Sequence, residues 1–335
     1  MSKKWPGGII TPTPATPSGP YQDGAAPGIW TLSQQSYWQK QGLWPIAGNS
    51  QRGLFGGGSA ASASNVIDYI TITTTGNATT FGSLTVARDS LSSCGSSTRG
   101  VFAGGGTSNV IDYVTILTTG NATDFGDLTQ NTNASGSAAN STRGIFAGSD
   151  TGTVSAISYI TIASVGNATF FGSLSQSRYA TAGCASPTRG VFGGGYTATY
   201  VNTIDYVTIA TTGNATDFGD LTVVMRYSMS ASSSTRGIFA GAANNFPTMS
   251  NVINYITIAT TGNATSFGNL LVARGAGAGA STETRAVFGG GYASSSYSNI
   301  IEYVTIATTG NATDFGDLTI ARYYLGACSN SSGGL

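Results

Sequence analysis

The chain of 335 residues contains no histidine. Without histidine, Ser-His-Asp and Cys-His catalysis are excluded, and so is the commonest protein ligand of metal ions. Charged residues make up 8% of the chain and the formal net charge is zero, whereas charged residues are about a quarter of an average domain. Nucleic-acid binding needs clustered lysine and arginine, so we expect no nucleic-acid partner.

Long apolar runs and cysteines are also scarce. No stretch of about 20 apolar residues is present, and no apolar segment follows Lys3 and Lys4 as it does in a secretion signal. We therefore expect neither membrane insertion nor Sec export. The three cysteines, Cys94, Cys184 and Cys328, are too few and too widely spaced for a disulfide framework. They are expected to be small buried thiols made in a reducing compartment.

Glycine, serine, threonine and alanine dominate instead, and they are arranged in a repeat. The motif Gly-Asn-Ala-Thr occurs six times, starting at Gly76, Gly120, Gly166, Gly213, Gly262 and Gly310. A tyrosine always lies 12 residues before a repeat phenylalanine, as Tyr69 lies before Phe81. Each repeat has a second phenylalanine, which precedes the tyrosine. Only the distance in sequence from this second phenylalanine to the tyrosine varies, from 11 residues to 16. Insertions confined to one loop of each repeat usually mark one face, which is often the binding face.

Each repeat of 44 to 49 residues contains four short segments that are rich in β-branched and aromatic residues. This pattern predicts an all-β fold, a six-bladed β-propeller of four-stranded antiparallel blades over residues 47–335. A solenoid is the alternative. A closed ring is favoured because both ends carry a spare first strand, Ile46–Gln51 and Tyr323–Ser329. Of the two, we favour the C-terminal strand for closure.

The repeats resemble the kelch propeller family. The resemblance rests on the double glycines, such as Gly56-Gly57 and Gly193-Gly194, on the six repeat tyrosines, and on an arginine after the fourth strand. The pattern departs from the family at Ser149 and Ala242 in the double glycine, at Asn131 in place of the arginine, and where phenylalanine replaces tryptophan. The resemblance implies the fold but no function, because propellers have many functions.

Residues 1–46 differ from the repeats, since they contain all four tryptophans and seven of the nine prolines. They predict an extended docking arm with one short helix, which begins with a Thr31/Gln34 capping box and ends near Gly42. The expected docking residues are Trp30, Leu32, Tyr37, Trp38 and Trp44. The segments Pro27–Leu32 and Gln41–Pro45 resemble segments of virion structural and tail-fibre proteins of marine cyanophages.

All eleven arginines are interpreted as occupying two repeat positions. One set follows threonine in a turn and is expected to pair neighbouring blades through carbonyl or carboxylate acceptors; a ligand-facing ring is the alternative. This structural set comprises Arg99, Arg143, Arg189, Arg236 and Arg285. The eleventh arginine, Arg52, occupies the same position after the spare first strand Ile46–Gln51 but follows glutamine. The other set follows the fourth strand, and we expect it nearer the variable-loop face. It comprises Arg88, Arg178, Arg226, Arg274 and Arg322.

Acidic residues and asparagines recur as well. Asp-Phe-Gly-Asp occurs at Asp124, Asp217 and Asp314, without the catalytic-loop partner that a kinase needs. Ca²⁺ binding is possible in principle, but half of the repeats lack the carboxylates, so we favour ion pairs with the Thr-Arg arginines of neighbouring blades. The Asn-Ala-Thr acceptor sites are interpreted as turns in which glycine adopts positive φ and asparagine bonds its own backbone. Neither Glu283 nor Glu302 has an evident catalytic partner. We expect no catalytic residue, no metal and no cofactor.

The variable loops combine small polar residues with aromatics, a composition typical of adaptable binding surfaces. The candidate ligand-binding residues are Tyr196, Tyr200, Phe246, Tyr292 and Tyr297, which would suit sugar rings. A solvated rim without a ligand is the alternative.

The favoured hypothesis is a non-enzymatic phage virion protein, assembled in the host cytoplasm. It docks to other virion proteins through its arm, and its loops face outward, towards a host-surface glycan. The alternatives are a capsid or tail decoration protein without ligand binding, and an intracellular kelch-type interaction module.

Overall fold

The computed structural model describes residues 51–330 except 152–153, 246–247 and 295, and within the first fifty residues only 4–5, 8–9, 31 and 33–34. The chain divides into two units, Met1–Ser50 and Gln51–Leu335.

In the first unit, β1 (Lys4–Trp5) pairs with β2 (Gly8–Ile9) in an antiparallel ladder. The Thr31 N–H donates to Gln34 Oε1 at 2.9 Å, and the Gln34 N–H donates to Thr31 Oγ1 at 3.2 Å. These are the reciprocal bonds of a capping box, and Ser33 and Gln34 are helical. The rest of the predicted helix lies outside the described residues, as do all five predicted docking residues.

The second unit is all-β, as the sequence predicts. Its described residues form six four-stranded antiparallel sheets. The first strands are β6 (Ser92–Gly95), β10 (Gly136–Ala139), β14 (Ala182–Ala185), β18 (Met229–Ser232), β23 (Ala278–Ser281) and β29 (Gly326–Ser329). The second strands are β3 (Arg52–Gly56), β7 (Arg99–Ala103), β11 (Arg143–Ser149), β15 (Arg189–Gly193), β19 (Arg236–Asn245) and β24 (Arg285–Gly289).

The third strands are β4 (Val66–Thr71), β8 (Ser108–Thr115), β12 (Val154–Thr161), β16 (Thr203–Thr208), β20 (Thr248–Thr257) and β27 (Ile300–Thr305). The fourth strands are β5 (Thr79–Ser83), β9 (Thr123–Thr132), β13 (Thr169–Ser173), β17 (Thr216–Asp220), β21 (Thr265–Asn269) and β28 (Thr313–Asp317). A small separate sheet joins β22 (Arg274–Gly275), β25 (Tyr292–Ala293) and β26 (Ser296–Tyr297).

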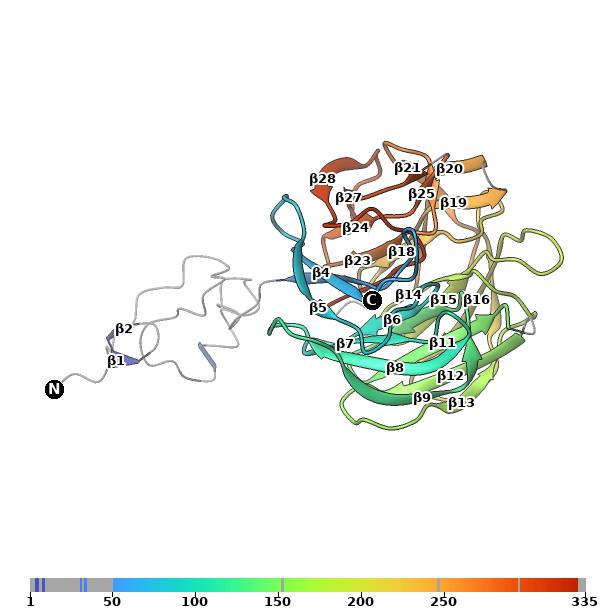
Figure 1. Cartoon of the computed structure of the whole chain (residues 1–335). Helices are drawn as coiled ribbons and strands as arrows, with labels where there is room; N and C mark the ends of the chain where they lie inside the picture. The colour runs from blue at the N-terminus through green and yellow to red at the C-terminus, as the bar shows by residue number, and fades with distance from the viewer. Residues whose placement is uncertain are drawn as a thin grey trace. The chain divides into compact units, whose positions relative to one another are not determined.

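Burial falls from the first strand of each sheet to the fourth. First strands such as Ala182–Ala185 consist mainly of small residues and are completely buried, and they lie towards the middle of the unit (Figure 1). Third strands such as Thr203–Thr208 combine buried and exposed positions. Fourth strands, such as Thr216–Asp220, begin with exposed residues and lie at the periphery. Small residues are required in the middle because the first strands contact one another there.

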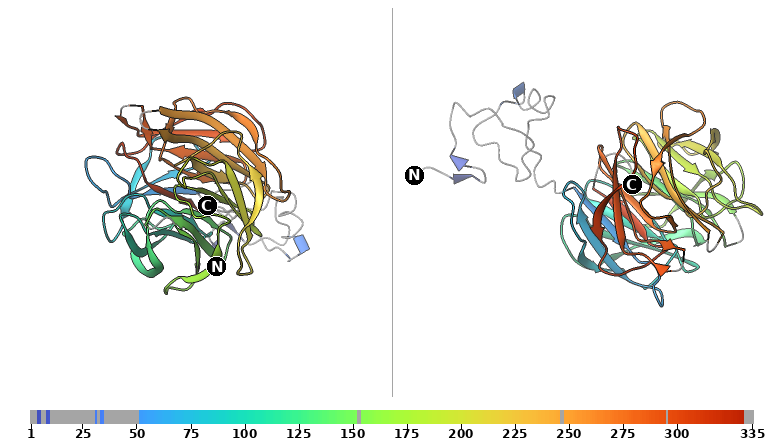
Figure 2. Two further views of the ribbon diagram at one scale, coloured as in Figure 1. Left: turned by 90° about the vertical axis from the view of Figure 1, so that its right-hand side faces the viewer. Right: turned by 90° about the horizontal axis from the view of Figure 1, so that it is seen from above.

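The last sheet packs against the first. β29 pairs with β3, so the C-terminal strand completes the N-terminal sheet, as the sequence analysis favours. Phe55 and Ile72 of the first sheet share one hydrophobic cluster with Val287 and Phe315 of the last. Five further clusters join the remaining pairs of consecutive sheets. In both views of Figure 2 the blue first sheet lies beside the red last sheet.

The Gly-Asn-Ala-Thr motif joins neighbouring sheets at the periphery. In each case asparagine Oδ1 accepts a hydrogen bond from the backbone of the preceding sheet's fourth strand, as Asn214 does from the Ser173 N–H at 3.1 Å. The interpretation that this asparagine bonds its own backbone is therefore wrong. The glycine after the repeat phenylalanine permits the contact, because a Cβ on Gly172 would lie 2.1 Å from the carbonyl oxygen of Gly213.

We predict that Gly172→Ala destabilises the protein by about 1–3 kcal/mol, since the two backbones would have to separate. The matched control is Gly213→Ala, on the other side of the same contact, where a Cβ would meet nothing within 4 Å. We expect that change to stay within about 0.5 kcal/mol. Chemical denaturation of both variants measures the difference, and equal stabilities would contradict this account of the motif.

Candidate functional site

Four buried ion pairs fix the connections between consecutive sheets. Arg178, which lies between β13 and β14, donates through Nη2 to Asp205 on β16 at 3.1 Å and to the carbonyl oxygen of Phe192 at 3.2 Å. Both side chains of the ion pair are 0% exposed. Asp205 also accepts hydrogen bonds from the Ser175 backbone and hydroxyl. The connection that leaves one sheet is thereby fixed to the third strand of the next.

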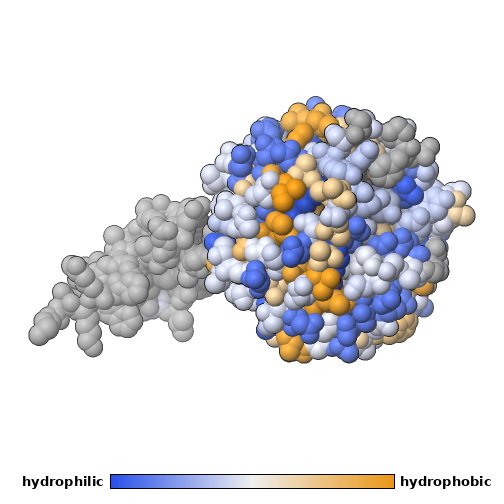
Figure 3. Space-filling model, in the orientation of Figure 1, coloured by the Kyte–Doolittle hydropathy of each residue, from blue (hydrophilic) through white to orange (hydrophobic). Residues whose placement is uncertain are grey.

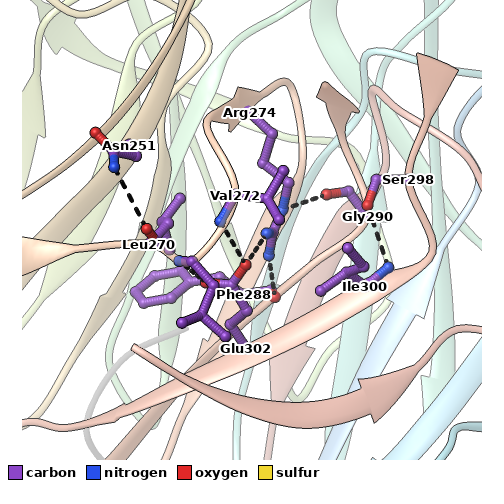
Figure 4. Close-up of polar contacts among 10 residues, drawn as sticks. Asn251, Leu270, Val272, Arg274, Phe288, Gly290, Ser298, Ile300 and Glu302 are labelled. Atoms are coloured by element: carbon purple, nitrogen blue, oxygen red, sulfur yellow. Dashed lines mark hydrogen bonds and ion pairs between the residues drawn. The ribbon is translucent and has the colours of Figure 1, made fainter. Parts of the chain in front are cut away.

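The same arrangement occurs in three other places. Arg88 pairs with Asp112, Arg274 with Glu302, and Arg322 with Asp68. Figure 4 shows Arg274 pointing towards Glu302, with the carbonyl groups of Gly290 and Phe288 as its other acceptors. Burial lowers the pKa of all four arginines, and the adjacent carboxylate opposes that shift. The Arg322 pair also fixes the last connection to the first sheet.

In the two remaining sheets, neutral residues replace both members of the pair. Met225 occupies the arginine position, because Gly195 N–H donates to its carbonyl oxygen just as Gly58 N–H donates to that of Arg88. Asn254 occupies the acid position and donates to Met225 Sδ. By the same criterion Thr132, and not Asn131 as the sequence analysis has it, replaces the arginine in the connection to the third sheet. Ser158 occupies the acid position there, and its hydroxyl is hydrogen-bonded to that of Thr129 at 2.6 Å. Replacing both members leaves no unpaired charge in the core, where such a charge is expensive.

This alignment of the buried pair positions also corrects the expected roles of Arg226 and of the Asp-Phe-Gly-Asp carboxylates. Arg226 is not equivalent to the buried arginines, because it follows Met225 by one residue; its guanidinium lies outside the buried pair position. The ion pairs predicted between the Asp-Phe-Gly-Asp carboxylates and the Thr-Arg arginines are wrong as well: the four salt bridges among the described residues use other acids and the other arginine set. Glu302, which had no evident partner in the sequence, is one of those acids.

The Thr-Arg arginines bond to carbonyl groups instead. Arg99 donates from Nη1 to the carbonyl oxygen of Ile162 in the next sheet at 2.9 Å, and its guanidinium lies 4.6 Å from the ring centroid of Tyr113. Tyr113 in turn makes an edge contact with Phe125 at 5.8 Å. Arg143, Arg189, Arg236 and Arg285 make the corresponding contacts. The invariant spacing of tyrosine and phenylalanine follows from this stack.

A closed ring of six backbone hydrogen bonds surrounds the axis of the unit. Each N–H donates to the carbonyl oxygen of the preceding member at 2.6–3.0 Å, and the Ser90 N–H closes the ring by donating to Tyr324. The members are Ser90, Ala134, Ala180, Tyr227, Ala276 and Tyr324. All six are non-glycine residues with φ of 53–58°, a conformation that persists only where the surroundings enforce it. The ring surrounds the mouth of a cavity of about 100 Å³. Two buried hydroxyls that line this cavity, on Thr181 and Ser228, have no hydrogen-bond partner among the described residues.

A network of tyrosines extends from this mouth across the variable loops. Eight tyrosines are joined by ring contacts with centroid distances of 4.5–6.4 Å. They are Tyr179, Tyr196, Tyr200, Tyr227, Tyr292, Tyr297, Tyr323 and Tyr324. Apart from the six repeat tyrosines, these are all the tyrosines of residues 51–330. Tyr297 is 41% exposed, and the other seven are half-buried.

The network shows that the variable loops and the fourth-to-first connections share one face, as the sequence predicts. Tyr179 belongs to a connection and Tyr196 to a variable loop, and they are joined by a β-bridge and by ring contact. Burial raises the pKa of Tyr227 and of Tyr324. Both phenols therefore remain neutral hydrogen-bonding groups at physiological pH.

Four of the five candidate ligand-binding residues lie in this network, and Phe246 lies outside the described residues. The other four members lie in the fourth-to-first connections, outside the variable loops, and were not among the predicted residues. A signal in the sequence could have found them, because four tyrosines lie shortly after a fourth strand and belong to no repeat motif. They are Tyr179, Tyr227, Tyr323 and Tyr324. Figure 3 shows hydrophobic residues in orange among hydrophilic ones on the face drawn.

The three cysteines are buried and free, as the sequence predicts, and burial raises the pKa of Cys328 to about 12. In the described part of the chain, no cluster of three or more acidic, histidine or cysteine side chains could hold a metal ion. No helix there is long and apolar enough to span a membrane. Comparison of the chain with protein-family models and with curated proteins finds no match.

We predict that Asp205→Asn destabilises the protein by about 3–5 kcal/mol, because Arg178 keeps its charge in the core without a carboxylate. Adding Arg178→Met reproduces the neutral pair that Met225 and Asn254 form, so the double variant is expected to regain most of the loss. Urea denaturation of both variants measures this. If the double variant is no more stable than Asp205→Asn, the unpaired charge of Arg178 is not the cause of the lost stability. The account of why both members of the pair are replaced together would then be wrong.

Proposed function

We propose that the chain is a non-enzymatic recognition protein of a phage particle. Residues 47–335 form a six-bladed, kelch-like β-propeller whose tyrosine-rich face binds a saccharide on the host surface. Residues 1–46 dock the propeller to other virion proteins. The tyrosine network is the observation that carries the proposal, because its side chains lie outside the repeat motifs and make none of the side-chain contacts that recur in every repeat.

The packing of the last sheet against the first supports a closed propeller rather than a solenoid. A solenoid would leave the first and last repeats without a neighbour on one side, whereas here Arg285 donates to the carbonyl oxygen of Ile72 in the first sheet at 2.9 Å. The ring of backbone hydrogen bonds around the axis likewise joins the last connection to the first.

The chemistry of the network supports a saccharide ligand. Tyrosine offers a flat apolar ring for stacking and a hydroxyl for hydrogen bonds, the two kinds of contact that a sugar ring requires. Tyr297 and Tyr323 are stacked with an interplanar angle of 7°, and other contacts are tilted, so the rings present faces in several directions. A decoration protein without a ligand gives no reason for collecting eight tyrosines on one face.

The docking proposal predicts that association with the particle depends on the arm. We expect full-length protein to co-sediment with the phage particles that carry it, and a version lacking residues 1–46 to remain in solution. Trp38→Ala is expected to weaken association, because a buried tryptophan typically dominates such contacts. Association of neither version would reject the virion role.

The recognition proposal predicts that replacing Tyr196, Tyr200, Tyr292 and Tyr297 by serine abolishes adsorption to host cells while particles still assemble. The matched control is serine at four exposed threonines of the peripheral turns: Thr74, Thr118, Thr211 and Thr308. These residues lie between the third and fourth strands. Normal adsorption of the tyrosine variant would contradict saccharide recognition and favour the decoration role.

A further inference from the structure

Arg226 differs from every other described arginine because its terminal nitrogens, Nη1 and Nη2, donate no hydrogen bond to another described residue. The remaining ten arginines each donate from Nη1 or Nη2 to a carbonyl or carboxylate group. Arg226 uses only Nε, which donates to the Ala243 carbonyl oxygen at 3.3 Å. Within the described residues, both of its Nη groups lack an acceptor and no carboxylate forms a salt bridge with it. Its side chain is half-buried, so it remains accessible.

The guanidinium is nevertheless held in place by aromatic rings. Its central carbon lies 5.4 Å from the ring centroid of Tyr196, 5.3 Å from that of Tyr200 and 5.0 Å from that of Tyr227. Rings at these distances attract a cation without satisfying its N–H groups. The side chain thus loses little freedom when it binds an anion, and its paired donors match the two oxygens of a carboxylate.

Sequence register explains why this arginine is available. The preceding position is the buried one, and Met225 fills it, so Arg226 is displaced by one residue towards the loop face. The corresponding positions in the other connections hold Asp89, Asn133, Tyr179, Gly275 and Tyr323. Arg226 is therefore the only cation in that ring of equivalent positions. It lies among the tyrosines rather than beside the acid at Asp89.

We propose that Arg226 and its three tyrosines form a subsite for an acidic saccharide. A carboxylate of the sugar binds the two free Nη groups, and the sugar ring stacks on Tyr196 or Tyr200. This inference rests on the proposed saccharide recognition and adds the charge of the ligand. Since the network otherwise consists of neutral phenols, this arginine determines the selection of acidic over neutral chains.

The test is binding of full-length protein to an oligosaccharide array that contains uronate-bearing, sialylated and neutral chains. Each acidic chain is also printed as its methyl ester, which keeps the ring and removes the charge. We expect binding to the acids and not to their esters. Arg226→Gln should weaken binding by about 10- to 100-fold, the effect of losing a hydrogen-bonded charge. Arg226→Lys should lose less, because it retains the charge without the fork. Thermal denaturation of each variant checks that the fold is intact.

The outcomes separate the two proposals. Binding that is equal for acids and esters, or that persists in Arg226→Gln, would overturn the acidic subsite while leaving saccharide recognition in place. Binding of neutral chains alone would do the same. Binding to no chain on the array would reject both.

Discussion

Backbone hydrogen bonds around the axis are the constraint on which the rest of the structure depends. Six connections, each with one residue held at positive φ, donate to one another in a closed cycle. The first strands meet beside this ring, which is why they consist mainly of serine, glycine, alanine and cysteine. Apart from Met229 in β18, larger residues begin with the second strand, where the sheets diverge and phenylalanine and isoleucine fill the space between them. Stability thus resides in contacts that every repeat makes with its neighbours.

The buried ion pairs illustrate how such a repeat tolerates variation. A charged pair in the core is stable only if both charges are present, so the sequence changes both members together, to Met225 with Asn254 and to Thr132 with Ser158. The loops between second and third strands are under no such restriction, because they contact solvent on one side. Insertions and tyrosines accumulate there without disturbing the ion pairs or the peripheral asparagine contacts.

Structural and candidate recognition residues are thereby separated in space. The Thr-Arg arginines contact only groups of the fold: they stack on the repeat tyrosines and donate hydrogen bonds to carbonyl groups of the next sheet. The side chains of the loop-face tyrosines make none of the contacts that recur in every repeat, although the backbones of Tyr227 and Tyr324 belong to the hydrogen-bonded ring. Arg226 is available there only because a methionine occupies the buried position before it. A displacement of one residue changes an arginine from a core element into a candidate ligand group.

The sequence by itself determined the repeat, the all-β class, the strand positions and the face that carries the variable loops, because these follow from local periodicity and spacing. It also indicated four members of the tyrosine network. It could not determine which acids pair with which arginines: Asp205 is 27 residues from Arg178, and only the packing of consecutive sheets brings them together. Both members of the pair recur at fixed positions, the arginine seven residues after the repeat phenylalanine and the acid one residue before the repeat tyrosine. Counting from Phe218 places Met225, and not Arg226, in the buried position. Only tertiary contact shows that the two positions meet, because the partners lie on different sheets.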